Sequence, residues 1–220
     1  TDADYSQSSQ GPIKAISPFE QKRNKALSVQ DTPNIFTLSG NYELPFGRGK
    51  IFGASSNTFT NLLISGWQVS GIFRATSGQP LAFRSGYCNV PSQFAVACIP
   101  SVLPGKSPYA QDRGSFDPNR PLFDVNAFTP KSAFNFYYGD GARVSNLRGF
   151  GFVNLDVGIF KSFTIKERVV LQLRGEAFNL FNTHSFLNSF VADVQNPAFG
   201  MWNGNVTAPR NLQLGGKITF

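Results

Sequence analysis

The sequence predicts an all-β fold, built from long antiparallel strands. Only 15% of the 220 residues are charged, while the chain holds 23 phenylalanines, 21 glycines and 14 prolines. This composition offers few strong helix formers, and it is too apolar and aromatic for a disordered chain. The third observation is that five segments alternate apolar and polar residues with a period of two, which is typical of strands with two different faces.

The first two segments establish the alternation. In residues 34–46 one face carries Phe36, Leu38, Gly40, Tyr42 and Leu44, and the other carries Thr37, Ser39, Asn41 and Glu43. In residues 64–77 one face carries Trp67, Val69, Gly71, Phe73 and Ala75, and the other carries Gln68, Ser70, Arg74 and Thr76. Ile72 is the exception, because it falls on the polar face. Each segment predicts a strand that separates two environments.

The last three segments repeat the pattern. In residues 152–163 the apolar Val153, Leu155, Val157 and Ile159 alternate with Asn154, Asp156 and Gly158. In residues 168–181 the apolar face carries Val169, Leu171, Leu173, Gly175 and Ala177, and the polar face carries Arg168, Gln172, Arg174 and Glu176. In residues 211–220 the apolar face carries Leu212, Leu214, Gly216, Ile218 and Phe220, and the polar face carries Asn211, Gln213, Lys217 and Thr219.

The lengths of the strands and loops point to a barrel in a membrane. The expected strands have about 10 to 14 residues, whereas a tilted strand needs about 9–11 to cross a bilayer. Their connections alternate between short ones, 47–63 and 164–167, and long ones, 78–151 and 182–210. This alternation is typical of a bacterial outer-membrane β-barrel with periplasmic turns and large external loops. If the last strand ends in the periplasm, both long loops lie outside.

The remaining segment, residues 1–33, is polar and contains prolines. Counting the strands back from a last strand that ends in the periplasm also places this segment outside, as an external loop or N-terminal arm. Residues 34–220 hold the strands and their loops. The net charge is +7, but the basic residues form no dense block. The run that comes nearest to one is Lys22-Arg23-Asn24-Lys25. We therefore expect a solvated tail and no nucleic-acid partner. The sequence contains no run of 18 consecutive apolar residues, so it predicts no transmembrane helix.

Two cysteines, Cys88 and Cys98, bracket a short piece of the first long loop. Together with the single histidine, His184, they are too few for a four-ligand structural zinc site, and they form no CxxC motif. A local disulfide is the simplest interpretation, and it would place this loop in an oxidising compartment. A pair of unrelated free thiols is the alternative.

Five charged residues fall on the polar faces of the expected strands. They are Arg74, Arg168, Arg174, Glu176 and Lys217. In a soluble protein these side chains would simply face water. In a membrane barrel they must face the lumen, because a charge on the lipid face costs roughly 2–4 kcal/mol at mid-bilayer. There they would line a passage or brace a plug domain.

No motif predicts covalent chemistry. The chain has neither a GxSxG elbow nor a GxxxxGK[ST] phosphate loop, and His184 falls in a loop. We expect no enzyme, no cofactor and no metal site. The aromatic run of residues 134–138, FNFYY, either packs inside its loop or forms a contact surface.

The end of the chain resembles the assembly signal of bacterial outer-membrane proteins, an amphipathic last strand with a terminal aromatic residue. The residues that carry this resemblance are Leu212, Leu214, Gly216, Ile218 and Phe220. The resemblance implies that the barrel-insertion machinery of the outer membrane reads this strand.

Further pieces resemble TonB-dependent receptor-like barrels of the Oar and carboxypeptidase-regulatory type. They are residues 42–50 (YELPFGRGK), 66–72 (GWQVSGI) with 77–81 (SGQPL), 146–156 (NLRGFGFVNLD) with 160–163 (FKSF), and 167–168 (ER) with 171–182 (LQLRGEAFNLFN). Taken in order, the similar pieces span residues 34–220. The resemblance implies the last five strands of a barrel of 22 strands that closes around an N-terminal plug.

The 220 residues hold neither the plug nor its energy-coupling box, and five strands are fewer than the roughly eight of the smallest single-chain barrels. We expect the C-terminal part of a receptor that takes up a bulky ligand such as a siderophore, glycan or peptide. Its partners would be the remaining strands, the plug and outer-membrane lipid. The alternative is a processed fragment, beginning at Thr1, that pairs with identical chains by its strand edges to form an extracellular fibre or oligomeric assembly.

Overall fold

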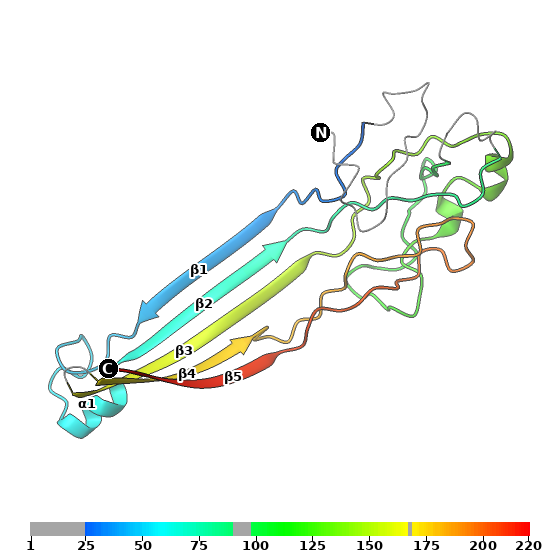
Figure 1. Ribbon diagram of the computed structural model, residues 1–220. Helices are drawn as coiled ribbons and strands as arrows, with labels where there is room; N and C mark the ends of the chain where they lie inside the picture. Colours follow the sequence, from blue (N-terminus) through cyan, green and yellow to red (C-terminus); the bar gives the residue numbers. More distant parts are fainter. Residues whose placement is uncertain (1–24, 90–97, 167–168) are drawn as a thin grey trace. The chain divides into compact units, whose positions relative to one another are not determined.

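The computed structural model describes residues 25–89, 98–166 and 169–220 (Figure 1). Its regular structure is one antiparallel sheet of five strands in the order β1-β2-β3-β4-β5. The strands are β1 Ile35–Glu43, β2 Trp67–Thr76, β3 Phe152–Lys166, β4 Val169–Phe178 and β5 Asn211–Thr219. The described sheet is open, with β1 and β5 at its two edges. The prediction of an all-β fold with long antiparallel strands is confirmed.

Helices are few and short in the described residues. The helix α1, Thr58–Ile64, lies in the connection between β1 and β2, and two 3-10 helices, η3 (Val125–Ala127) and η4 (Lys131–Asn135), lie in the first long loop. Asn57 begins α1, because its side chain accepts a hydrogen bond of 2.7 Å from the backbone N–H of Thr60. None of the described helices is long and apolar enough to cross a membrane.

Several strand ends differ from the prediction, each for a local reason. The first strand stops at Glu43 instead of Phe46, because Pro45 has no N–H to donate to a neighbouring strand. The second starts at Trp67, because Ile64 belongs to α1. The fourth stops at Phe178, because Asn179 turns the backbone into the left-handed region with a φ of 53°. The third continues to Lys166, three residues beyond its predicted end.

The register of the sheet brings the apolar positions of all five strands onto one face. Across the first three strands Phe36 lies opposite Ala75, which lies opposite Val153. Across the last two, Ala177 lies opposite Leu212. Because partners in a ladder point to the same side, one face is apolar and the other is polar. Ile72 lies on the polar face, as its place in the sequence predicts.

The chain forms two compact units that interleave along the sequence. The sheet unit contains residues 34–76, 152–185 and 207–220, that is, the strands, α1 and the turns that join them. The loop unit contains residues 77–151 and 186–206 together with the segment that precedes the first strand.

The buried hydrophobic core lies in the loop unit. Its members are Leu81, Phe83, Cys98, Leu122, Phe123, Ala127, Phe128, Phe134, Val194 and Phe199. Rings pack edge-on at the centre, where Phe83 contacts Phe123 at 5.1 Å and Phe128 contacts Phe199 at 5.1 Å between centroids. Isolated bridges, such as Val102 with Phe128, replace regular strands in this unit. Packing of aromatic rings therefore organises the two long loops.

Candidate functional site: the two faces of the sheet and the loop unit

The polar face of the sheet carries four of the five charged residues that the sequence singles out. They are Arg74, Arg174, Glu176 and Lys217. The fifth, Arg168, lies outside the described residues. Arg174 and Glu176 are neighbours on β4, and 3.7 Å separates Arg174 Nε from Glu176 Oε2. Arg74, Arg174 and Lys217 are exposed and Glu176 is partly buried, so the face offers charge to whatever lies in front of it.

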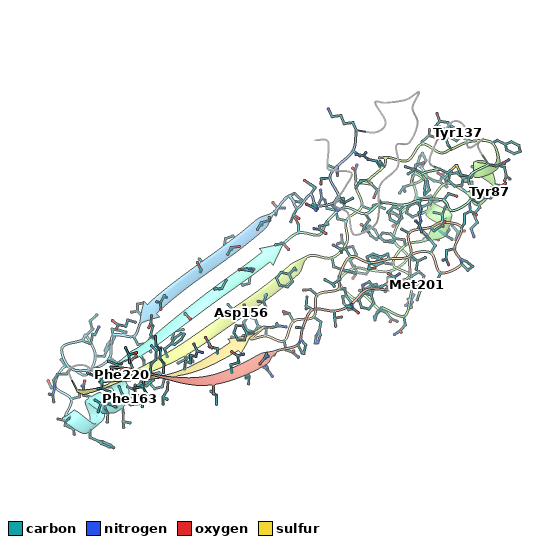
Figure 2. The ribbon with its side chains drawn as sticks, viewed as in Figure 1. Tyr87, Tyr137, Asp156, Phe163, Met201 and Phe220 are labelled. Atoms are coloured by element: carbon teal, nitrogen blue, oxygen red, sulfur yellow. A yellow bond between two sulfur atoms is a disulfide. The ribbon has the colours of Figure 1, made fainter. Side chains whose placement is uncertain are left out.

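A network of hydrogen bonds lies at the end of this polar face where β3 begins and β4 ends. The carboxylate of Asp156, which is labelled in Figure 2, accepts hydrogen bonds from Asn154 Nδ2 at 2.9 Å and from the N–H of Asn179 at 2.8 Å. The buried Asn179 also donates to the carbonyls of Thr183 and Ala208. It thereby ties the end of β4 to the segment that enters β5.

The opposite face of the sheet exposes apolar side chains on β1, β3, β4 and β5, while those of β2 are partly buried. The exposed residues include Phe36, Leu38, Tyr42, Val153, Ile159, Leu173, Leu212, Leu214 and Ile218. Leu214, in the last strand, is 93% exposed. Phe220 follows β5 and is exposed too, so the residues of the expected assembly signal lie along one edge of this face. A soluble monomer rarely leaves so extended an apolar surface open to water.

In the loop unit Cys88 and Cys98 are joined by a disulfide, with 5.5 Å between their Cα atoms. Cys98 belongs to the buried core, and its carbonyl accepts a hydrogen bond of 2.9 Å from the N–H of Ser85. The bond therefore fastens a loop to the aromatic core. Among the described residues no group of three His, Cys, Asp or Glu side chains could hold a metal ion.

The aromatic run of residues 134–138 divides between packing and surface. Phe134 is fully buried in the core, whereas Phe136 is 91% exposed. Asn89 links this run to the disulfide loop, because its N–H and its side-chain amide donate to the carbonyls of Phe134 and Asn135. Tyr87 and Tyr137, both labelled in Figure 2, are also exposed.

The NLRGFG piece of the sequence serves as an anchor within the loop unit. Arg148 donates to the carbonyls of Asp31 and Gly78 at 3.0 and 3.1 Å, and its guanidinium pairs with the carboxylate of Asp31. Next to it, a Cβ on Gly149 would lie 1.8 Å from Asn188 Oδ1. Any larger residue at this position would displace the side chain of Asn188 in the second long loop.

The chain is similar to a known family over nearly its whole length. A family model described as an outer membrane beta barrel domain matches residues 1–213. The chain belongs to this outer-membrane β-barrel family. No curated protein and no solved structure matches the chain. Family membership places the protein in the outer membrane, and it accounts for a sheet with one polar and one apolar face.

Lys161 is a charged residue of the sheet that the polar-face pattern does not include. Lys161 lies on the apolar face, where it pairs with Trp67 on one side and Leu173 on the other. Its side chain is nevertheless buried. Its ammonium group donates hydrogen bonds to the carbonyls of Leu62, at 2.8 Å, and Ser65. The aromatic rings of Trp67 and Phe163 flank the charge at 5.4 and 4.9 Å. Period two beyond Ile159 already places Lys161 on the apolar face, and that signal could have found it.

The two asparagines of residues 178–182 (FNLFN) were not predicted to have a structural role either. Asn179 and Asn182 are the two described non-glycine residues with positive φ, at 53° and 52°. Asparagine tolerates this conformation better than most residues, because its short side chain can bond to the nearby backbone. Asn182 Oδ1 accepts a hydrogen bond of 2.9 Å from the N–H of Arg210. Two asparagines three positions apart just after a strand are the sequence signal for this turn.

Proposed function

We propose that this chain is part of a TonB-dependent outer-membrane receptor that takes up a bulky ligand without covalent chemistry. The observation that carries the proposal is the loop unit. Two long loops, separated by 34 residues of strand and turn between Gly151 and Phe186, fold into one compact body with its own aromatic core. A barrel that needed only a seal would not require an ordered body of this size. Such a body suits the capture of a large molecule at the cell surface.

The polar face supplies the second element of the proposal. Arg74, Arg174, Glu176 and Lys217 would face the lumen, where they line the passage or brace a plug. The opposite face would contact lipid. With this assignment every exposed leucine of β5 would contact lipid, and none of these four charges would.

The receptor would also need partners. The open edges of β1 and β5 require further strands, because unpaired backbone groups are prohibitively costly in lipid. The partners would be the remaining barrel strands and a plug domain. The barrel-insertion machinery would recognise the last strand through Leu212, Leu214, Gly216, Ile218 and Phe220.

The same two open edges favour a second candidate function. A chain with two free strand edges can pair with copies of itself, by edge-to-edge addition, into an extracellular fibre or an oligomeric barrel. In that assembly the apolar faces would cover one another instead of meeting lipid.

The mass of the native particle, isolated without detergent and then with it, tests the two candidates. The receptor predicts a particle that is stable only in detergent, is much heavier than 24.1 kDa, and yields peptides of plug sequence on digestion. A detergent-free particle built from 24.1 kDa chains alone would contradict the receptor and support the fibre.

A further inference from the structure

The connection between β1 and β2 contains an apolar surface that the receptor function does not use. Three residues of α1, Phe59, Leu62 and Leu63, have exposed side chains, and Phe59 is 72% exposed. Their spacing of three and four places them along one side of the helix. The short helix is therefore amphipathic, with its apolar side left open.

The other side of α1 is fixed by polar contacts within its own connection. Asn61 Oδ1 accepts a hydrogen bond of 2.5 Å from the N–H of Arg48, and the Asn61 carbonyl accepts one from Ser65. Ile64 packs beside Gly53, where an added Cβ would lie 2.7 Å from Ile64 Cδ1. The helix thus cannot roll to bury its apolar side without losing these contacts.

Two residues of the sheet hold the C-terminal end of α1 at the apolar face. Lys161 donates to the carbonyls of Leu62 and Ser65, and the indole N–H of Trp67 donates to the carbonyl of Leu63 at 2.8 Å. Lys161 and Trp67 are cross-strand partners that point to the apolar face. A lysine at the end of a helix satisfies carbonyls that have no partner within the helix. In return, the helix covers a charge that would otherwise meet lipid.

The position along the strands sets the depth of this element. Trp67 is the first residue of β2, so the contact lies at the end of the sheet and not at its middle. Figure 1 shows α1 at the same end of the sheet as the C-terminus, and Figure 2 shows Phe163 and Phe220 at that end. Aromatic residues and lysines gather at this level in membrane proteins, where an apolar body meets water.

We propose that α1 is an interfacial element, which rests on the surface of the membrane and inserts Phe59, Leu62 and Leu63 at the boundary between lipid headgroups and acyl chains. The occupant of the apolar side is lipid, because the helix continues the apolar face that meets lipid in an outer-membrane barrel. The inference rests on the proposed position of the sheet in the membrane, and it is independent of what the receptor takes up.

Site-directed spin labelling of the full-length protein tests the proposal. Both native cysteines of this chain are joined in a disulfide, so an introduced cysteine gives it one reactive thiol. Leu63→Cys reports the apolar side of α1, Thr60→Cys reports its polar flank as the matched control, and Leu214→Cys reports the sheet. Each labelled protein is reconstituted in vesicles of phosphatidylethanolamine and phosphatidylglycerol. Collision with oxygen, which concentrates in lipid, is then compared with collision with a water-soluble nickel complex.

We expect the ratio of oxygen to nickel accessibility to be several-fold higher at Leu63 than at Thr60, and to approach that of Leu214. A label at Leu63 that meets nickel while Leu214 stays in lipid would overturn the interfacial element and leave the receptor intact. A label at Leu63 that meets neither reagent would show that protein covers the helix, which also overturns it. Nickel access at Leu214 would overturn both proposals, because the sheet would not lie in a bilayer.

Discussion

The sheet unit and the loop unit of this barrel protein differ in the exposure of their apolar side chains. In the sheet, Leu214 is 93% exposed although it belongs to a regular strand with complete pairing on one side. In the loop unit, Phe123 is 1% exposed although it belongs to no strand or helix. In this protein the regular strands and the buried hydrophobic core therefore belong to different units.

In the proposed receptor, the difference would reflect the solvent that each unit meets. A barrel wall satisfies its backbone through strand pairing and uses lipid as the apolar phase, so it needs no core between its faces. A loop body outside the membrane meets water and must bury its own apolar rings, with turns, bridges and a disulfide in place of long strands. Each prediction below affects one unit and leaves the other unchanged.

The largest expected effect is the loss of a core ring from the loop unit. Phe123→Ala removes a fully buried ring, and such changes cost about 3–5 kcal/mol. The chain offers a reporter for each unit, because its two tryptophans are Trp67 in the sheet unit and Trp202 in the loop unit. We expect the fluorescence of Trp202, in a Trp67→Phe background, to report unfolding of the loop unit at much lower denaturant concentration.

Phe136→Ala is the matched control for that prediction, because the ring it removes is 91% exposed. Its effect on stability should stay within about 0.5 kcal/mol. Equal effects of the two substitutions would show that the loop unit has no aromatic core of its own.

The next effect concerns the apolar face of the sheet. Leu214→Lys places a charge toward lipid at a cost of roughly 2–4 kcal/mol, and we expect it to abolish membrane assembly. Gln213→Lys, one residue earlier on the polar face, should be tolerated. The measurement is the fraction of protein recovered in the outer membrane. Equal recovery of both variants would contradict the assignment of the faces.

Loss of the disulfide should destabilise the loop unit alone. The double substitution Cys88→Ser and Cys98→Ser removes a staple across ten residues of sequence separation, worth at most about 3 kcal/mol by loop closure. The Trp202 signal should shift to lower denaturant, while assembly of the barrel sheet is unchanged. Failed assembly would mean that the loop unit must fold before the strands insert.

The smallest of these effects tests the end of the polar face. Asn179→Ala removes a buried amide that bonds to the carbonyls of Thr183 and Ala208, and it forces alanine into a left-handed turn, at a cost of about 1–3 kcal/mol. Asn179→Gly keeps the turn and loses only the amide, so it should cost less. Heat-induced unfolding on a gel without prior boiling measures both. A larger loss for glycine would contradict the role of the backbone conformation.

The sequence predicted the sheet well, because period two is a direct consequence of strand geometry. The polar positions of Arg74, Arg174, Glu176 and Lys217 follow from that period alone. What the sequence could not predict in the sheet is the set of tertiary contacts that its residues make. Lys161 lies on the face that the pattern marks as apolar, and only a helix packed over it explains why a charge is tolerated there.

The loop unit was beyond prediction for a different reason. Its residues show no period, since its fold comes from rings such as Phe83 and Phe199 that meet across long stretches of sequence. The sequence indicated the two long loops and the cysteine pair. It could not indicate that residues 77–151 and 186–206 form one body, nor that Phe134 is buried while Phe136 is exposed.

The most direct test of the central claim, a barrel wall with one lipid face and one lumen face, is a cysteine scan of β5. Single cysteines at positions 211–219 are treated with a water-soluble maleimide in intact outer membranes. We expect labelling with a period of two, at Gln213, Lys217 and Thr219 but not at Leu212, Leu214 and Ile218. Uniform labelling along the strand would contradict it.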